Sequence, residues 1–284
     1  MKKKILRALS AFILLMLLFV RPVCAQKYKR IISLAPSVTE SLYELGLEKE
    51  IAGISVFCPK GKSGKEIIGT ILEPDIEKIV LLKPDLIIST KEGNSKSSVE
   101  KLQRLGFDVF VMETSGGFKE ICANFAALAV KVEESEKAQK LIKQAEREVL
   151  DIYSEISLMP AKQSVFWEVG AKPLYTAGRG SFVNDYNYYT RTANIYGDTD
   201  IRYPCVSIED VISRNPDIII MVNMGDISFE EINVWKKYDS VSAVKNGKIH
   251  MLDADDIFTP TPAAFAKGLR MLARTIFPEL FNDK

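Results

Sequence analysis

The chain of 284 residues carries 38 Lys and Arg against 37 Asp and Glu, and it has one histidine, His250. A charge this close to zero excludes a nucleic-acid binder, which would need a strong basic excess. A single histidine excludes a metal site built from several histidines. With 47% hydrophobic and 26% charged residues, the composition is that of a globular protein of one or two domains.

Residues 1–25 have the pattern of a cleavable secretory signal peptide. Basic residues at positions 2–4 and 7 precede an uncharged run at 8–20, and small residues lead to a predicted cleavage site after Ala25. The run is shorter than the ~20 apolar residues of a membrane-spanning helix. The alternative is a lipoprotein anchored through Cys24, although Arg21 stands where the lipidation motif normally has leucine.

Export changes the charge and the redox environment of the chain. Residues 1–25 hold five basic residues and no acidic one, so 33 basic and 37 acidic residues remain, a net charge of −4. Disulfides form in exported proteins, and the remaining cysteines are Cys58, Cys122 and Cys205. Cys58 and Cys205 both lie beside prolines in predicted loops and are the candidate pair. Three unpaired thiols are the alternative.

Strand-like aliphatic runs alternate with helical patterns along the rest of the chain. The first half has predicted strands at 29–34, 51–55, 85–89 and 109–112, with helices beginning at 36 and spanning 76–82 and 99–105. The second half has strands at 164–169, 218–221 and 248–252, with helices at 208–212 and 263–276. This alternation predicts an α/β protein with parallel sheets covered by helices. The tyrosine-rich segment 184–189 is predicted to be a helix face that packs on its lobe.

A stretch without glycine or proline, 133–158, lies between the two halves. Its apolar residues recur at spacings of three, four and one, which indicates a single amphipathic helix. A helix of this length would span nearly 40 Å at ~1.5 Å per residue. We interpret it as a rigid bridge across two lobes. A coiled-coil dimer is disfavoured because the apolar stripe is too broad for a heptad seam.

An internal repeat relates the two halves. Residues 76–88 (IEKIVLLKPDLII) reappear 132 residues later as 208–220 (IEDVISRNPDIII), with six of 13 positions identical. In each copy a cap residue, Asp75 or Ser207, precedes the helix, and a proline ends it. The aspartate after each proline then precedes an aliphatic run, as expected of a strand buried on both faces. The matched glutamates Glu77 and Glu209 favour a true structural repeat.

These residues resemble a known family. The similar segments are IISLAPSVTE at 31–40 with Leu45-Gly46, the stretch 77–89, Gly93-Asn94, Leu105-Gly106, Pro204, Ser207, Glu209 and the Pro260-Thr261-Pro262 run. They resemble periplasmic substrate-binding proteins of the cobalamin, haem and ferric-siderophore uptake class. The resemblance covers nearly all of residues 30–278 and is nearest to the cobalamin binders.

The resemblance implies the class III periplasmic-binding-protein fold, in which two Rossmann-like lobes with parallel sheets are joined by one long rigid helix. Residues 26–132 would form the N-terminal lobe, 133–160 the bridging helix and 161–284 the C-terminal lobe. It also implies delivery of the ligand to an inner-membrane ABC permease with its ATPase. In this family a glutamate on each lobe pairs with permease arginines, and those positions match Glu77 and Glu209. The alternative for each glutamate is a favourable place in the first turn of a helix.

The expected ligand is a cobalamin-like corrinoid or an iron chelate, with a ferric siderophore or haem as the alternatives. Because ligands bind at the carboxyl ends of parallel strands, the candidate ligand-binding residues are Pro36, Phe57, Ile71, Lys91, Tyr175, Tyr203, Met224 and Phe258. The resemblance implies that Ile71, Thr90 and Tyr203 stand where cobalamin binders have tryptophan. The arginine usual after the last proline is replaced by Ala263. The candidate substitutes are Lys60, Lys91, Lys172, Arg179 and Arg202, and the alternative for each is a solvated charge at the rim.

A second class of function is a secreted α/β enzyme that uses the same cleft. The chain lacks the G-x-S-x-G and G-x-x-x-x-G-K-[ST] motifs, and Gly178-Arg179-Gly180 lacks the third glycine of a dinucleotide fingerprint. We expect no catalytic residues, no resident cofactor or metal and no nucleic-acid partner, and we expect a monomer. His250 is predicted to be a structural histidine near a sheet edge. A third class of function is an adhesion or sensor module, which would have the same fold without the permease contacts.

Overall fold

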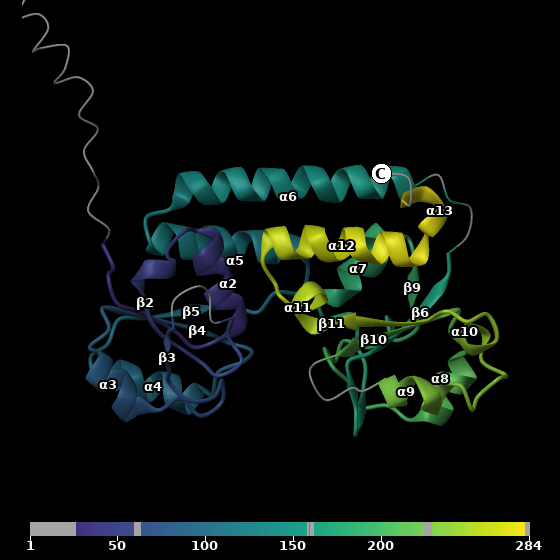
Figure 1. Ribbon diagram of the computed structural model, residues 1–284, viewed down its shortest axis with the longest axis horizontal. Helices are drawn as coiled ribbons and strands as arrows, with labels where there is room; N and C mark the ends of the chain where they lie inside the picture. Colours follow the sequence, from purple (N-terminus) through teal and green to yellow (C-terminus); the bar gives the residue numbers. More distant parts are fainter. Residues whose placement is uncertain (1–26, 60–63, 158, 160–161, 224–228, 282–284) are drawn as a thin grey trace, which may run out of the picture.

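The computed structural model describes residues 27–59, 64–157, 159, 162–223 and 229–281. The signal peptide predicted for 1–25, with Cys24, and the candidates Lys60 and Met224 lie outside these residues. Within the described ranges, no helix is both long and apolar enough to cross a membrane. Two lobes lie side by side, and the long helix α6 (Ser135–Ile156) lies over both of them (Figure 1).

The sheet of the N-terminal lobe has the strand order β3-β2-β1-β4-β5, and every neighbouring pair is parallel. Its strands are β1 (Ile31–Ser33), β2 (Ile51–Ile54), β3 (Glu66–Ile67), β4 (Leu86–Thr90) and β5 (Val109–Met112). This is the 3-2-1-4-5 order of doubly wound sheets, in which the order of the strands reverses beside the first strand.

The sheet of the C-terminal lobe has the order β11-β10-β6-β9, again with parallel pairs. Its strands are β6 (Ser164–Glu168), β9 (Ala193–Asn194), β10 (Ile218–Asn223) and β11 (Ile249–Asp253), and an antiparallel hairpin is formed by β7 (Gly170–Ala171) and β8 (Leu174–Tyr175). The predicted α/β fold class with two parallel-sheet lobes is thereby confirmed.

Helices cover both sheets. Those before α6 are α2 (Pro36–Glu44), the 3₁₀ turn η1 (Glu48–Glu50), α3 (Ile76–Leu82), α4 (Lys96–Arg104) and α5 (Phe118–Lys131). Those after it are α7 (Val183–Tyr189), α8 (Ile208–Arg214), α9 (Phe229–Trp235), α10 (Ser242–Lys245), α11 (Ala254–Ile257), α12 (Pro262–Ile276) and α13 (Pro278–Phe281). As expected, α7 packs on its lobe, with Tyr186 fully buried.

Helix α6 takes part in the cores of both lobes. It packs against α5, α7 and α12. Ala138 belongs to the N-terminal core, whereas Ala145, Val149 and Ile152 belong to the C-terminal core. With 22 residues, the helix is about 33 Å long at ~1.5 Å per residue. It is shorter than the range 133–160, because Glu133 adopts a φ of 63° and turns the chain between α5 and α6.

The sequence repeat is also a structural repeat. The side chains of Asp75 and Ser207 accept hydrogen bonds from the third residue of the helix that each precedes, and both helices end in a left-handed residue with φ of 46°, Lys83 or Asn215. Each helix then leads into the strand that pairs with the first strand of its lobe, β4 with β1 and β10 with β6.

The repeated aspartates have matching partners as well. The Asp85 carboxylate accepts backbone hydrogen bonds from Lys29 (2.7 Å) and Arg30 (3.0 Å), just before β1. Asp217 accepts from the backbone N–H of Ser164 at 2.8 Å and from its hydroxyl at 2.8 Å, at the start of β6. Each aspartate therefore fastens the first strand of its lobe to the strand beside it.

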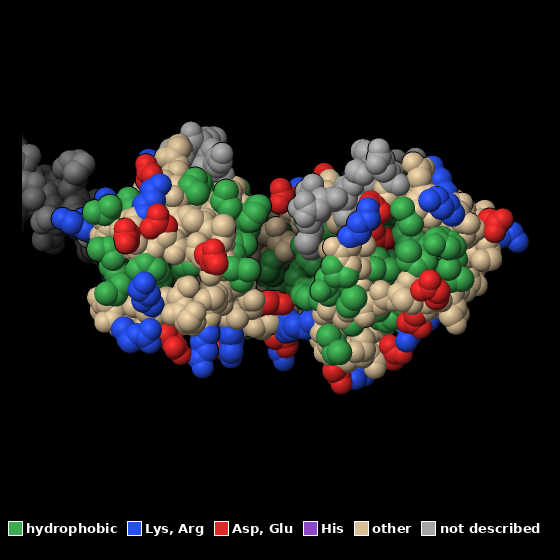
Figure 2. Space-filling view, turned by 90° about the horizontal axis from the view of Figure 1, so that it is seen from below, with side chains coloured by type: hydrophobic (Ala, Val, Ile, Leu, Met, Phe, Trp, Pro, Cys, Tyr) green, Lys and Arg blue, Asp and Glu red, His purple; other side chains and the backbone are tan. Residues whose placement is uncertain are grey.

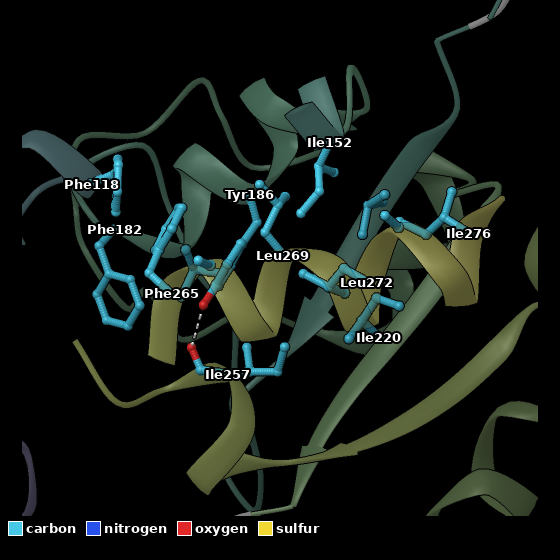
Figure 3. Packing of buried hydrophobic residues seen from close by; sticks show 14 of the residues in the cluster. Phe118, Ile152, Phe182, Tyr186, Ile220, Ile257, Phe265, Leu269, Leu272 and Ile276 are labelled. Carbon is cyan, nitrogen blue, oxygen red and sulfur yellow. Dashed lines mark hydrogen bonds between the residues drawn. The ribbon is translucent and has the colours of Figure 1, made fainter. Parts of the chain in front are cut away.

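A stack of aromatic rings joins the lobes under α6. Phe265 of α12 stacks on Phe118 of α5 with a centroid distance of 4.8 Å, and on Tyr186 of α7 at 4.4 Å. The Tyr186 hydroxyl donates a hydrogen bond of 3.1 Å to the carbonyl of Ile257 in α11 (Figure 3). Since Phe118 follows the N-terminal sheet and the other residues belong to the C-terminal lobe, this stack holds one lobe against the other.

Two polar contacts also connect the lobes, each at the start of a helix. The Asp185 carboxylate of α7 accepts a 2.7 Å hydrogen bond from the Phe118 N–H and so caps α5. A Cβ atom on Gly117 would collide with this carboxylate, so glycine is required there. The Thr261 hydroxyl caps α12 and also donates to Glu44 Oε1 of α2 at 2.5 Å.

The candidate disulfide between Cys58 and Cys205 is not present, and the expectation is corrected. Cys58, Cys122 and Cys205, the cysteines of the described residues, are free thiols. Cys58 is buried in the core of the N-terminal lobe with its Sγ 3.0 Å from Ser55 Oγ, whereas Cys205 is exposed and pairs through its backbone with Tyr175 of the C-terminal lobe. The two thiols lie on different lobes. The prediction rested on the prolines beside both cysteines, and these indicate loops but not which lobe a loop belongs to.

Removing the central ring of the interlobe stack should destabilise the protein strongly. Phe265 is fully buried, and Phe265→Ala is expected to cost ~3–5 kcal/mol because it leaves a cavity between the lobes. Urea unfolding measures the loss. The control Leu81→Ala, at a side chain that is 79% exposed, should change the free energy of unfolding by less than ~0.5 kcal/mol. Equal effects of the two variants would contradict the importance of the stack.

The Glu44 contact predicts a pH dependence of stability. Burial, and to a lesser degree the charge of Glu40, raises the pKa of Glu44 from 4.5 to about 7, although the Thr261 hydrogen bond favours ionisation. The native state therefore binds the Glu44 proton more tightly than the unfolded chain does. The contribution of the protonated carboxyl to the free energy of unfolding is complete below about pH 4.5 and is lost as the pH rises to about 7.

Glu44→Gln cannot ionise and should show a smaller fall in unfolding free energy between pH 5 and pH 7.5 than the parent protein. The fall should not vanish, because burial also raises the pKa of Glu168 to about 7. The measurement is the unfolding free energy across this range, with Glu136→Gln at an exposed position of α6 as the control. Identical pH profiles for Glu44→Gln and the parent would refute the assignment.

Candidate functional site

A cleft opens between the lobes on the side opposite α6, and hydrophobic side chains line its depth (Figure 2). It consists of two adjoining pockets with cavity volumes of about 210 and 680 Å³. The pockets share Pro36 from one lobe and Phe258 and Thr259 from the other. Ligand pockets commonly have volumes of ~300–1,000 Å³, so the joined cleft is large enough for a ligand of at least drug size.

The N-terminal wall of the cleft comes from loops at the carboxyl ends of the strands. Pro36 follows β1, Ile71 follows β3, Thr90 ends β4 and Glu92 follows it. One buried side chain, Asn94, holds three of these loops together. Its amide donates to the carbonyls of Leu34 (3.0 Å) and Ile71 (2.8 Å), and its Oδ1 accepts from the Thr90 N–H at 2.7 Å.

The C-terminal wall is built around Phe258, which follows α11. Its ring packs against Phe182 at a centroid distance of 5.8 Å and against Tyr203 at 6.2 Å. Asn223 and Asp253, the last residues of the neighbouring strands β10 and β11, complete the second pocket. Both walls therefore use the carboxyl ends of parallel strands, the usual place for ligands in open α/β sheets.

Four of the predicted ligand residues line the cleft. Pro36 and Phe258 contribute to both pockets, Ile71 to the first and Phe57 to the second. The Phe57 side chain is 71% exposed, so a bound molecule could cover its ring.

The other described candidates lie outside the lining. Lys91 lies at the rim, where its Nζ is 2.9 Å from Glu113 Oε2. Tyr203 lies behind Phe258, and burial raises its pKa to about 12. Tyr175 is in β8, where its ring packs on Gly170.

The sequence reasoning missed several lining residues. Glu113 and Ser115 follow β5, Asp253 ends β11, and Asn124 and Phe182 come from α5 and the start of α7. The carboxyl ends of β5 and β11 obey the same rule that selected the other loops, so they could have been found. Asn124 and Phe182 come from helical segments and carry no such signal.

Acidic groups dominate the electrostatics near the second pocket. Burial, and secondly the charge of Asp255, raises the pKa of Glu40 on α2, whereas Lys267 lowers it. Lys267 is itself 2.6 Å from Asp256 Oδ1. His250 is half-buried in β11, the edge strand of its sheet, as expected of a structural histidine. Burial and the charge of Lys248 lower its pKa.

No group of three or more His, Cys, Asp or Glu in the described parts of the chain is arranged to hold a metal ion. The repeated glutamates are exposed, each in the first turn of its helix, Glu77 in α3 and Glu209 in α8. Hydrogen bonds from its own backbone N–H and from Ser207 lower the pKa of Glu209. Helices α3 and α8 lie at the ends of the two lobes remote from α6 (Figure 1).

Comparisons with known proteins agree with this architecture. Residues 31–255 match the family described as periplasmic binding protein. A vitamin B12-binding protein of Vibrio cholerae is 30% identical over 238 residues, covering 82% of this chain and 84% of that protein. The crystal structure of the periplasmic vitamin B12-binding protein BtuF of Vibrio cholerae has a TM-score of 0.75 and 27% identity, covering 90% of this chain and 99% of that chain.

A second solved structure, titled as a possible iron-binding, periplasmic solute-binding protein from Staphylococcus epidermidis, has a TM-score of 0.77 and 32% identity, covering 89% of this chain and all of that one. The match to the family model over most of the chain, the two-lobed fold and the interlobe cleft agree with one another. The chain belongs to the periplasmic binding protein family.

Proposed function

We propose that this protein is the exported substrate-binding component of an ABC importer. It captures a cobalamin-like corrinoid or an iron chelate between its lobes and delivers it to an inner-membrane permease with its ATPase. The observation that carries the proposal is the cleft, which both lobes line at the carboxyl ends of their strands. The names of the Vibrio cholerae relatives favour a corrinoid, and the Staphylococcus epidermidis structure favours an iron chelate as the alternative.

Binding rather than catalysis is proposed for the cleft. A corrinoid or a ferric chelate brings its own metal, so the protein needs no resident cofactor. The apolar lining around Pro36, Ile71 and Phe258 suits contact with a macrocycle or an organic chelate shell. The chain supplies both walls of the cleft itself, which supports action as a monomer. Export by residues 1–25, with anchoring through Cys24 as the alternative, completes the proposal.

The repeated glutamates are proposed to dock the protein on the permease. A transporter with two-fold symmetry presents the same surface twice. The structural repeat supports the proposal because it places Glu77 and Glu209 at the same turn of equivalent helices, α3 and α8. Both side chains are exposed and therefore available to arginines of a partner.

Ligand binding is tested by titrating the protein with cyanocobalamin, haemin and a ferric hydroxamate. We expect at least one of them to bind at micromolar or lower concentration, and a ligand at 100 times its Kd to stabilise the fold by ~2.7 kcal/mol. Thr259→Trp should fill the cleft and abolish binding, because Thr259 lines both pockets. Lys140→Trp, at an exposed position of α6, is the matched control. If no probe binds, or if Thr259→Trp binds normally, the proposed ligand site is wrong.

Docking is tested by a double charge reversal. Glu77→Lys with Glu209→Lys should abolish uptake of the bound ligand in cells and leave its Kd unchanged, because neither residue lines the cleft. Each single reversal should reduce uptake less. Reversal of Glu136 and Glu146, exposed on α6 away from the opening of the cleft, controls for the change in net charge. Normal uptake by the Glu77/Glu209 variant, or a loss of affinity, would count against docking through these residues.

A further inference from the structure

The charged groups that line the cleft are all acidic in the described part of the chain. The first pocket is lined by Glu92 and Glu113, and the second by Asp253, Asp255 and Asp256. Lysine and arginine do not occur among the described lining residues of either pocket. A cleft of this kind offers carboxylate oxygens and apolar surface to its ligand.

The cations closest to these carboxylates are held in ion pairs. Lys91 Nζ lies 2.9 Å from Glu113 Oε2, and Lys267 Nζ lies 2.6 Å from Asp256 Oδ1. Arg202 Nη1 lies 3.2 Å from Glu92 Oε1 and 3.2 Å from the Ser115 carbonyl. Among the described residues, three of the five lining carboxylates are thus paired with a cation, and Asp253 and Asp255 have no salt bridge.

The Arg202 contact differs from an ordinary surface ion pair because it crosses between the lobes. Arg202 belongs to the C-terminal lobe, whereas Glu92 and Ser115 belong to loops after β4 and β5 of the N-terminal lobe. Its guanidinium is partly covered, with 32% of the side chain exposed. Arginine is well suited to bind carboxylates, and here its Nη1 already contacts Glu92 and the Ser115 carbonyl.

We propose that Glu92 and Glu113 determine the charge class of the ligand. By holding Arg202 and Lys91, they make the cleft accept an uncharged or cationic ligand and reject one that carries free carboxylates or other anionic groups. An anionic ligand would have to displace these glutamates from their partners or lie against uncompensated carboxylates, and both are unfavourable in a partly desolvated cleft.

This inference rests on the proposed function as a carrier, and it narrows the ligand. An amide-rich corrinoid or a neutral or cationic ferric hydroxamate fits the charge of the cleft. Haem, with its propionates, and anionic catecholate or carboxylate chelates do not. Burial, and secondly the negative charge of Asp255, raises the pKa of the neighbouring Glu40 of α2, so this region disfavours a further negative charge.

The test compares ligands that differ in one charged group. One pair is cyanocobalamin and its monocarboxylic derivative, in which one side-chain amide is hydrolysed. The other is ferrioxamine B and its N-succinyl derivative, in which a carboxylate replaces the ammonium group. For whichever pair binds, we expect the carboxylated member to have a Kd at least about tenfold higher at low salt. This ratio should shrink in 0.5 M NaCl, because salt screens charges at a distance.

Glu92→Gln with Glu113→Gln releases Arg202 and Lys91, and the ratio of the two Kd values should then fall below about threefold. Glu136→Gln with Glu146→Gln on α6 changes the net charge equally and should leave the ratio unchanged. If the double cleft variant folds poorly by thermal melting, Glu113→Gln alone, at a side chain that is 66% exposed, serves in its place.

The outcomes separate the two proposals. If the parent protein binds both members of a pair equally, or prefers the carboxylated one, the charge inference is overturned while the carrier function stands. A ratio that persists in the Glu92/Glu113 variant overturns the role of these two residues. If haemin binds and no member of either pair does, the charge inference is overturned while the carrier function stands. If haemin does not bind either, the proposed function fails, and the charge inference fails with it.

Discussion

The geometry of the cleft depends on how one lobe is held against the other, and a buried aromatic stack does this. Phe265 lies between Phe118 and Tyr186, so a ring that follows the N-terminal sheet is packed among side chains of the C-terminal lobe. Close packing of this kind resists small displacements, because every shift opens a void or causes a clash. Helix α6 lies over the stack and enters both cores. Two hydrogen bonds, from the Phe118 N–H to Asp185 and from the Thr261 hydroxyl to Glu44, also connect the lobes.

The walls of the cleft are in turn fixed within each lobe. Each wall is made of loops at the carboxyl ends of parallel strands, and these loops are tied to their own sheet, as Asn94 ties three of them in the N-terminal lobe. The charged side chains among the described lining residues are acidic. Arg202 lies beside the cleft and forms an ion pair with Glu92 of the other lobe, and this pair is the basis of the proposed charge selectivity.

The repeat gives the protein two equivalent surfaces on a chain that is not otherwise symmetric. Asp75 and Ser207 differ chemically, yet both satisfy the N–H three residues on, and Asp85 and Asp217 both fasten the first strand of their lobe. Local backbone requirements explain why these positions match. The exposed Glu77 and Glu209 match as well. Each also has a favourable place in the first turn of its helix, and docking on a common partner is the further role proposed for the pair.

The sequence by itself determined the fold class, the repeat and the loops from which the cleft is built, because these follow from local patterns: aliphatic runs, caps, prolines and the spacing along α6. It also pointed to Pro36, Phe57, Ile71 and Phe258, which line the cleft. Only the tertiary structure decided the charge of the site. The pairing of Arg202 with Glu92 joins residues 110 positions apart, and the separation of Cys58 from Cys205 depends on which lobe each occupies. Such contacts arise from the packing of whole lobes, which no local pattern encodes.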